Sequence, residues 1–338
     1  MPEHSNARSR TDAVVIGRNE GDRLVACLRA LAPQVRRLVY VDSGSDDGSP
    51  ERARAEGAEV IALDPARPFS AARARNAGLA ALAGDPPEFV QLQDGDAVPR
   101  PAWVARGAAF LDATPRAAAV HGHTAEAAPE ASLYNRLIAD EWRAAPGETP
   151  ACTGVVLMRF APLHAIGGFR DDVIAAEDDE MALRLRAAGW TLHRMDADMA
   201  EHDARMLRFG QFWRRAVRAG HGFAQVGDLH PGYFRAERRR AWAWALVLPL
   251  VAAVLAPVLV PVLMPVLVPG IAALYAAAIV RMAARFRARG FSGRDALGAA
   301  LLFMASKPAN LAGMLRWRLR RWRGAAPRLI EYRQAGQG

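Results

Sequence analysis

Short apolar runs alternate with segments of helical periodicity over residues 11–96. Short apolar runs between polar turns are typical of buried strands, and apolar residues spaced three and four apart are typical of one helix face. The expected strands cover residues 13–16, 38–41, 59–63 and 89–93. The expected helices cover residues 24–31, 50–56 and 71–83. This β-α order predicts an α/β fold with a mostly parallel sheet and flanking helices, in which ligands bind at the carboxyl ends of the strands.

A second pattern begins at Ala241, where 40 residues up to Val280 carry no charge. A helix of that length would measure about 60 Å, twice the roughly 30 Å hydrocarbon core of a bilayer, so two passes fit better than one. Prolines between residues 257 and 270 could form the turn between them. Arginines flank both ends, and the positive-inside rule places such flanks in the cytoplasm. We therefore expect a membrane hairpin over residues 236–290, either spanning or re-entrant; a buried hairpin of a soluble protein is the alternative.

The region after the hairpin, residues 291–338, combines an apolar stretch with a run of arginines and tryptophans at 315–323. This pattern predicts a basic amphipathic helix in the lipid headgroup region, with a solvated basic tail as the alternative. Residues 281–338 carry 13 of the 44 basic residues and only the acids Asp295 and Glu331, so the rest of the chain is close to neutral despite the net charge of +9. A basic flank beside an apolar stretch indicates a membrane as partner and no nucleic acid.

These patterns divide the chain into a domain over residues 1–235, a hairpin over 236–290 and a C-terminal region over 291–338. Hydrophobic residues make up 51% and charged residues 23%, which excludes a disordered protein. The two cysteines, Cys27 and Cys152, provide neither a disulfide framework nor a Cys-x-x-Cys metal site, which fits a reducing compartment. No secretory signal is visible at the N-terminus, so the first domain is expected to stay in the cytoplasm.

Acidic residues follow three of the expected strands, at the edge where a ligand would bind. The first strand leads into residues 17–20, the second into 42–48 and the fourth into 94–96. Neither a Walker phosphate loop nor a Gly-x-Gly-x-x-Gly motif occurs, and the loop that begins at Asp42 lacks the glycine that a calcium loop needs. These absences exclude a P-loop enzyme, a dinucleotide-binding domain and an EF-hand.

Asp94 and Asp96 stand two residues apart at the end of a strand, so their side chains leave it on the same side and can converge on one divalent cation, Mn²⁺ or Mg²⁺. Such an ion would neutralise the charge that grows as a nucleoside diphosphate leaves. Two exposed loop aspartates are the alternative. Asp42 could accept the imide N–H of a uracil base, or it could cap its own turn.

Six short motifs occur in order: VVIGRNE at 14–20, VDSGSDDG at 41–48, ARNAG at 74–78, QDGD at 93–96, GGF at 167–169 and ED at 177–178. Together they resemble the ordered motif series of the family-2 glycosyltransferases, over roughly residues 11–225. The resemblance implies the GT-A fold, inverting transfer of a sugar from a nucleoside-diphosphate sugar, and a divalent metal. The combination with C-terminal membrane segments is similar to bacterial exopolysaccharide and cell-envelope members.

The resemblance also implies a role for each matching residue. Those implied to lie near the nucleotide sugar are Asn19, Glu20, Asp42, Arg75, Asn76 and Asp94. The metal motif is Asp94 and Asp96, with Asp96 the more direct ligand. His202 follows a short expected strand at 191–195 and could be a further ligand, or a histidine with a structural role only. Arg215 stands where processive synthases carry tryptophan, so processive polymerisation is not expected.

Asp178 is implied to be the catalytic base. It belongs to a run of acids, residues 177–180, that opens an expected helix, where acids are favoured for structural reasons as well. An acceptor hydroxyl needs a positioned base as it attacks the anomeric carbon, and crowding by neighbouring acids would raise the pKa of that base. Asp179 is the competing candidate.

We therefore expect transfer of one sugar to a glycan or lipid-linked envelope precursor at the cytoplasmic face of the bacterial inner membrane. A polyprenyl-phosphate sugar transferase would use the same motifs and membrane segments and is one alternative. A nucleotide-binding membrane adaptor without catalysis is another. Residues 122–153 could form the acceptor groove through Tyr134, Glu141 and Trp142, which could equally be packing residues.

Overall fold

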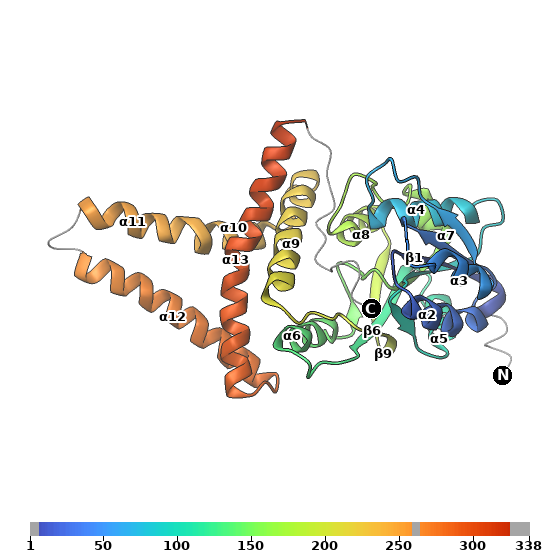
Figure 1. The fold of residues 1–338 in the computed structure, drawn as a ribbon, viewed down its shortest axis with the longest axis horizontal. Helices are drawn as coiled ribbons and strands as arrows, with labels where there is room; N and C mark the ends of the chain where they lie inside the picture. Colours follow the sequence, from blue (N-terminus) through green and yellow to red (C-terminus); the bar gives the residue numbers. More distant parts are fainter. Residues whose placement is uncertain (1–6, 259–263, 325–338) are drawn as a thin grey trace.

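The computed structural model describes residues 7–258 and 264–324, which form an α/β domain followed by a layer of long helices (Figure 1). The strands are β1 (Thr11–Gly17), β2 (Leu38–Asp42), β3 (Glu59–Ala62), β4 (Phe89–Asp94), β5 (Ala97–Pro99), β6 (Ala117–Glu126), β7 (Gly147–Glu148), β8 (Val156–Arg159) and β9 (Thr191–His202). The α-helices are α2 (Asp22–Leu31), α3 (Ser49–Ala55), α4 (Ala71–Leu82), α5 (Trp103–Ala113), α6 (Leu133–Trp142), α7 (Phe160–Ala165), α8 (Glu177–Ala187), α9 (Phe209–Leu229), α10 (Arg235–Trp242), α11 (Leu248–Val258), α12 (Met264–Ala288) and α13 (Gly293–Trp322).

One nine-stranded sheet organises the domain, in the order β3-β2-β1-β4-β8-β6-β9-β5, with β7 paired to β9. β1 pairs in parallel with β2 and with β4, and β2 pairs in parallel with β3. The register places Ile16 beside Asp94 and Gly17 beside Asp42, so the acidic loops leave the sheet at one edge. β8 joins antiparallel to β4 and β6, while β6 and β9 are parallel. The predicted α/β fold, with a mostly parallel sheet and flanking helices, is confirmed.

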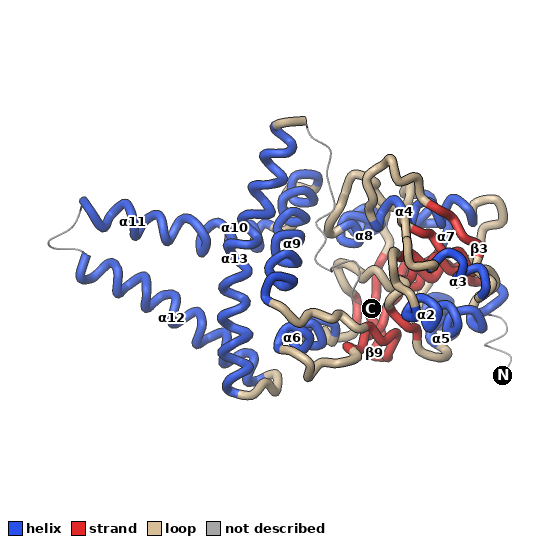
Figure 2. Tube along the Cα trace, in the orientation of Figure 1, coloured by secondary structure: helices blue, strands red, loops and turns tan. Residues whose placement is uncertain are grey.

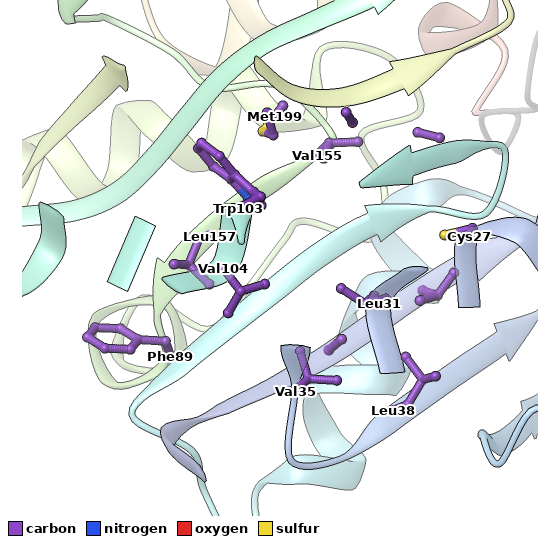
Figure 3. Close-up of a cluster of buried hydrophobic side chains, with 14 of the residues drawn as sticks. Cys27, Leu31, Val35, Leu38, Phe89, Trp103, Val104, Val155, Leu157 and Met199 are labelled. Carbon is purple, nitrogen blue, oxygen red and sulfur yellow. The ribbon is translucent and has the colours of Figure 1, made fainter. Parts of the chain in front are cut away.

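Both faces of the sheet are buried, as the uninterrupted apolar runs require. Along β1, Ala13 and Val15 belong to one apolar cluster and Val14 and Ile16 to the other. Helices α2 and α5 cover the first face, and α4, α7 and α8 cover the second. Figure 3 shows the first cluster, in which the buried Trp103 lies near Leu157 and Met199. The strand ends that carry the acidic loops are therefore fixed between two packed layers.

The four strands and three helices expected within residues 11–94 are all present, with ends that differ by one or two residues. The boundary expected at 191–195 is wrong, because β9 continues to His202. β6 supplies a parallel partner along that length, through shifts of register that accommodate the polar residues of β9. His202 is consequently held on a strand of the sheet and not on a loop after it.

The long helix α13 packs along α9, and the two backbones touch. A Cβ atom at Gly220 would lie 2.0 Å from the carbonyl oxygen of Asn310, and one at Gly313 would lie 2.0 Å from that of Val217. Only glycine permits so close an approach of two helix backbones. Figures 1 and 2 show this pair of helices standing between the α/β domain and helices α11 and α12.

Helices α11 and α12 extend away from the rest of the protein (Figure 2). Large apolar side chains are exposed on them and on the short π-helical segment before them: Leu246, Val247, Leu250, Val251, Leu274 and Val280. Among the described residues, Pro269–Ala288 is the one helical segment whose length and composition would allow it to cross a membrane. The turn of the expected hairpin was placed between residues 257 and 270; residues 264–270 belong to helix α12, and residues 259–263 lie outside the described residues. The hairpin and its crossings therefore stay a prediction.

The C-terminal region differs from the expected amphipathic surface helix. α13 is a single helix of 30 residues that continues through Pro308. Its small residues, including Ala299, Ala309 and Gly313, are buried. Hydropathy did not reveal this face because alanine, glycine and serine are only weakly apolar, yet they permit close helix packing. Only the final turns of α13, which end at the exposed Trp322, present the basic and aromatic surface that the sequence predicts.

We expect Gly313→Ala to destabilise the protein by about 1–3 kcal/mol, because the added methyl group overlaps the backbone of α9. Gly210→Ala is the matched control: it lies on α9 with no atom near the new methyl group and should be neutral or stabilising by up to about 1 kcal/mol. Thermal unfolding of both variants in detergent, followed by circular dichroism, checks this. Equal unfolding midpoints for the two variants would show that the α9–α13 contact is looser than described.

Candidate active site

The loops that follow β1, β2 and β4 open into one cleft of about 1360 Å³. Pockets that hold a single small ligand usually measure about 300–1,000 Å³, so this cleft has room for two reactants. One side, the domain wall, consists of lining residues from these loops and from α4 and α8. The other side, the helix wall, consists of lining residues from α9, α10, α12 and α13, among them Arg218, Arg240, Phe286, Phe303 and Lys307.

The loops after β1 and β2 are tied together by hydrogen bonds. The backbone N–H of Asn19 donates to Ser45 Oγ at 2.9 Å, and Asn19 Oδ1 accepts from the N–H of Asp46 at 2.9 Å. The N–H of Gly21 donates to Asp47 Oδ2 at 2.9 Å. Asn19 has a left-handed backbone with φ of 56°, a conformation that asparagine tolerates better than most residues. Asn19 therefore lines the cleft as part of a preformed loop pair.

Glu20, the neighbour of Asn19, also lines the cleft. Its carboxylate pairs with Arg23 at 2.7 Å and its side chain is mostly buried. The structure thus places both residues of the first motif at the mouth of the predicted nucleotide site. A contact of either with base or ribose stays a prediction.

Asp42 is held by its own turn. Its carboxylate accepts hydrogen bonds from Tyr40 Oη at 3.0 Å, from the N–H groups of Gly44 and Ser45 at 2.9 and 3.0 Å, and from Ser45 Oγ at 2.5 Å. Only 3% of the residue is exposed. Of the two roles that the sequence left open, this geometry matches the capping aspartate, and it lends no support to recognition of a uracil N–H. The bonds of Asp42 hold the loop that carries Asp46 and Asp47.

Asn76 likewise has a structural environment. Its amide group donates to the carbonyl of Phe169 and to Asp171 Oδ1, both at 2.7 Å. Its Oδ1 accepts from the N–H of Phe169 at 2.9 Å. The side chain therefore secures the Gly167–Asp171 segment, and the predicted contact of Asn76 with the donor sugar finds no support in these bonds.

Arg75, one position earlier on α4, occupies the centre of the domain wall with 3% of its side chain exposed. Its guanidinium lies 3.2 Å from Asp94, 3.0 Å from Asp178 and 3.3 Å from Glu177, and it stacks over the ring of Phe169. Burial lowers the pKa of Arg75, but the three carboxylates more than compensate, so it stays charged. Residues far apart in the sequence are thereby brought to one cation.

Asp178 is the carboxylate of this cluster best suited to accept a proton. Burial raises the pKa of Asp178 to about 7, with Glu177, Asp94 and Asp179 adding to the rise and Arg75 opposing it. A general base works best when its pKa lies near the working pH. The cluster thus shows the elevated pKa that the run of acids led us to expect.

Asp179 points to a different partner, since adjacent residues of a helix lie about 100° apart around its axis. Tyr233 Oη donates a hydrogen bond to Asp179 Oδ1 at 2.7 Å. Both aspartates line the cleft, but only Asp178 bonds to Arg75. The geometry therefore favours Asp178 over Asp179 as the base, although the assignment stays a prediction.

Asp94 and Asp96 leave the end of β4 toward different partners. Asp94 faces Arg75, whereas Asp96 is nearly buried with its Oδ2 3.1 Å from Nε2 of His202. Trp142 packs edge-on against the His202 ring, with 4.9 Å between centroids. Burial lowers the pKa of His202, which favours the neutral imidazole that can bind a metal.

These three side chains offer the donor atoms that Mn²⁺ accepts, namely carboxylate oxygen and imidazole nitrogen. In residues 7–258 and 264–324, however, no three such groups already converge as a metal centre. The donor set is therefore chemically suitable but is arranged as two pairs, Asp94 with Arg75 and Asp96 with His202.

One of the three residues predicted to form the acceptor groove lines the cleft. Glu141 lines the cleft and pairs with Arg215 of α9 at 3.0 Å, which gives the residue in place of the processive tryptophan a definite partner. Trp142 packs against His202, and Tyr134 packs against Phe212 with ring centroids 5.7 Å apart. Two of the three residues thus match the packing alternative.

Backbone strain is concentrated around the cleft. Five non-glycine residues among those described have left-handed backbones, and four of them line it: Asn19, Ala176, Arg205 and Phe234. Ala176, with φ of 59°, immediately precedes Glu177 and Asp178. Such strain costs about 1–3 kcal/mol per residue and is found preferentially at functional sites.

Apart from Arg215 of α9, sequence reasoning missed the helix wall, because residues 236–338 carried only a membrane prediction. One signal was present in the sequence: Lys307 is the single lysine of the chain. No pattern in the sequence indicated that this residue would face Asp178 and Arg75 across a common cleft.

Sequence profiles of two related families match the chain. The profile described as Glycosyl transferase family 2 matches residues 12–163, and the one described as Glycosyl transferase family group 2 matches residues 89–286. The second match covers more than half of the chain. The chain belongs to glycosyl transferase family group 2. It is a glycosyltransferase, and the resemblance found in its motifs is confirmed at this level.

One of two similar solved structures supports the fold of this glycosyltransferase. The mannosyltransferase PcManGT from Pyrobaculum calidifontis, in complex with GDP-Man and Mn²⁺, is 22% identical, with a TM-score of 0.57 over 92% of this chain and 87% of its own. Glucosyl-3-phosphoglycerate synthase from Mycobacterium tuberculosis is 18% identical, with a TM-score of 0.46 over 67% of this chain and 82% of its own. The first likeness is consistent with the GT-A fold.

A curated relative matches a shorter part of the glycosyltransferase. It is a TPR repeat-containing protein of Synechococcus elongatus, 38% identical over 90 residues, which amount to 27% of this chain. The chain spans about a fifth of the length of that relative, since the match covers 21% of it.

We expect Asp178→Asn to lower the transfer rate by about 10²–10⁴-fold, the usual effect of losing a general base. Donor affinity should change by no more than about twofold, because asparagine keeps the volume and can still accept a hydrogen bond from Arg75. Asp179→Asn, at the residue that bonds to Tyr233, is the matched control and should cost far less. Glu177→Gln should be intermediate, since Glu177 acts on Asp178 through its charge. Turnover and donor dissociation constants of the three variants provide the check.

The pH profile gives a second readout of the same assignment. Asp178 accepts a proton only when ionised, so turnover of the unmodified enzyme should rise with pH through about 7 and level off above it. Asp178→Asn should lack that rising limb. If Asp179→Asn is the inactive enzyme and Asp178→Asn is nearly normal, the base is the next residue along the helix.

Proposed function

We propose that this glycosyltransferase transfers one sugar, with inversion, from a nucleoside-diphosphate sugar to a membrane-associated acceptor at the cytoplasmic face of the membrane. The observation that carries the proposal is the shared cleft. Asp178 and Arg75 on its domain wall face a helix wall whose helices lead directly into the exposed apolar helices α11 and α12. A donor sugar bound at the domain wall and an acceptor that enters from the membrane would therefore meet in this cleft.

The reaction uses the domain wall. The acceptor hydroxyl gives its proton to the carboxylate of Asp178 while its oxygen bonds to the anomeric carbon. The bond from that carbon to the diphosphate oxygen breaks, and the nucleoside diphosphate leaves with the electron pair. Attack from the face opposite the leaving group inverts the anomeric configuration. Arg75 positions Asp178 and keeps its pKa from rising further, so that the base is ionised near neutral pH.

Asp94, Asp96 and His202 would hold the divalent cation. When bound, Mn²⁺ or Mg²⁺ would neutralise charge on the departing diphosphate. The donor set and the Mn²⁺ in the structure of the Pyrobaculum calidifontis mannosyltransferase support this part of the proposal. Asp96 and His202 already lie in contact. A methyl group at Gly154 would lie 2.5 Å from Arg75 Nη2 and 2.9 Å from Asp94 Oδ2, so the glycine permits this ion pair to lie against the backbone.

Helices α11 and α12 would contact the membrane. The exposed apolar residues on α11 and α12, and the arginines that flank this region at both ends, form the combination expected of a membrane segment with cytoplasmic ends. The acceptor would be a lipid-linked envelope glycan precursor, and a polyprenyl phosphate acceptor would use the same arrangement.

Removal of the metal-binding carboxylate should stop the reaction. We expect Asp96→Asn to abolish transfer and to weaken Mg²⁺-dependent binding of GDP and UDP by at least about tenfold, because an amide replaces a charged oxygen ligand. Asparagine keeps a hydrogen-bond partner for His202, so the thermal midpoint should change little. Asp46→Ala, at an exposed acid that lines the same cleft, is the control and should leave the metal dependence intact. Full activity in the presence of EDTA would contradict the metal role.

Membrane attachment can be tested with charges on the projecting helices. The double substitution Leu250→Asp with Leu274→Asp should move the protein into the soluble fraction, since an aspartate within a membrane helix costs about 2.5–3.5 kcal/mol. Leu207→Asp, at an equally exposed leucine before α9, should leave the protein in the carbonate-washed membrane pellet. Cell fractionation and immunoblotting compare the two. If the unmodified chain is found in the soluble fraction, this part of the proposal fails.

A further inference from the structure

Lys307 is an unusual residue both in the sequence and in the structure. It is the single lysine among 44 basic residues of the chain. It lies on α13, is only 8% exposed, and belongs to the helix wall of the active-site cleft. A buried lysine is rare unless a negative group pairs with it. The chain otherwise uses arginine throughout, so this position calls for a specific explanation.

The contacts of Lys307 separate it from the other cations of the helix wall. Arg215 pairs with Glu141 at 3.0 Å, Arg240 pairs with Glu237 at 2.8 Å, and Arg289 pairs with Asp140. The one side-chain contact found for Lys307 within the described part of the chain is to Phe303, whose ring centroid lies 3.8 Å from Nζ. No carboxylate in that part of the chain forms an ion pair with it. Its ammonium group therefore lies at the cleft without an ion-pair partner among the residues that the structure describes.

The electrostatic setting of Lys307 is unfavourable for a charge in the free enzyme. Burial and, to a smaller extent, the charge of Arg240 lower the pKa of Lys307 to about 8, although the nearby Glu237 acts in the opposite direction. A buried cation held in this way is stabilised when an anion enters beside it. The ammonium group is a compact point charge that suits a phosphate oxygen. Lys307 lines the cleft from α13, whereas Asp94 and Asp178 line it from the α/β domain.

The surroundings indicate what such an anion would be attached to. The same wall presents the aromatic rings of Phe212, Phe223, Phe286 and Phe303, and its helices continue into exposed apolar surface. The wall also carries polar groups, among them Arg218, Arg240 and Asn310, which suit the polar end of a ligand. Its aromatic rings and the exposed apolar surface beyond them suit a hydrocarbon chain. An anion that enters from this side would therefore arrive on an apolar chain.

We infer that Lys307 binds the phosphate group of a lipid-linked glycan acceptor, whose hydrocarbon chain runs along the helix wall toward α11 and α12. The inference rests on the proposed function, because it identifies the chemical class of the acceptor for the same cleft. A phosphate held at Lys307 would anchor the lipid end of the acceptor and leave the hydroxyl of its glycan free to reach Asp178. Lys307 is thus an acceptor-binding residue, distinct from the donor-binding groups of the domain wall.

The single lysine makes a direct test possible. Reductive methylation of the full-length protein in detergent with ¹³C-formaldehyde labels Lys307 and the N-terminal amine, and Lys307→Arg identifies which NMR signal belongs to the lysine. Farnesyl phosphate should shift that signal and raise the pKa of the amine by at least about one unit, as expected for a cation that gains an anion in a partly buried site. Farnesol should not raise this pKa.

Two further ligands distinguish the source of the phosphate. Inorganic phosphate should cause only a weak shift at millimolar concentration, because it lacks the chain that the aromatic wall binds. GDP or UDP with Mg²⁺ should leave the signal in place. If the nucleotides raise the pKa and farnesyl phosphate does not, Lys307 serves the donor diphosphate and the inference is overturned.

Substitution provides an independent measurement. Lys307→Met should weaken farnesyl phosphate binding by at least about tenfold, the effect of losing one charge-assisted contact, with farnesol binding unchanged. It should not lower the thermal midpoint, since methionine of similar shape removes an unpaired buried charge. Arg316→Met, at an exposed cation of the same helix, is the matched control.

The outcomes also separate this inference from the proposed function. One outcome would be that the enzyme transfers sugar to a phosphate-free acceptor and that Lys307→Met leaves the KM for that acceptor unchanged. The inference that Lys307 binds a lipid phosphate would then be wrong, while the proposed sugar transfer would be supported. If farnesyl phosphate binds through Lys307 in an enzyme that is inactive with every nucleotide sugar tried, the anion site stands and the proposed reaction fails.

Discussion

The site depends on one buried cation. The guanidinium of Arg75 joins the end of β4, through Asp94, to the start of α8, through Glu177 and Asp178. Without it, three carboxylates would face one another in a partly dry environment, where like charges repel strongly. The positions of the proposed base, Asp178, and of one proposed metal ligand, Asp94, are therefore set by the same side chain. That side chain is anchored on α4, whose inner face packs into the core of the domain.

The packing contact between helices α9 and α13 has a comparable importance for the helix wall of the cleft. Backbone contact at Gly220 and Gly313 leaves no room for the two helices to slide past one another without separating. Asp228, near the end of α9, accepts hydrogen bonds from Trp317 and Arg321 of α13 and from Arg238 of α10. Helices α9, α10 and α13 are consequently joined into one packed unit, in which Lys307 is held on α13.

Much of the fold could be predicted from the sequence, and less of the site. The parallel strands and their helices were predictable because their apolar periodicity records burial directly. The proximity of Arg75 to Asp178 was not, because it depends on how α4 and α8 pack on the sheet, and no local pattern encodes that. The family resemblance implied that Arg75 lies near the nucleotide sugar and that Asp178 is the base. It did not indicate the hydrogen bond between these two residues. Asn76 directly follows Arg75 on α4 yet bonds to the Gly167–Asp171 segment, since adjacent helix residues face different directions.

Ala176 illustrates how a plain residue can be strongly constrained. Alanine in a left-handed conformation suffers a clash between its Cβ and the backbone, and a branched side chain there would suffer more. Glycine would relieve the clash but would give the segment before α8 more freedom in the unfolded chain and in the folded one. In a library of all substitutions, this position should therefore tolerate fewer residues than most surface positions, although nothing in its chemistry is reactive. Selection on Ala176 would act through the geometry of the backbone, and a comparison of related enzymes should find small residues there even where the acceptors differ.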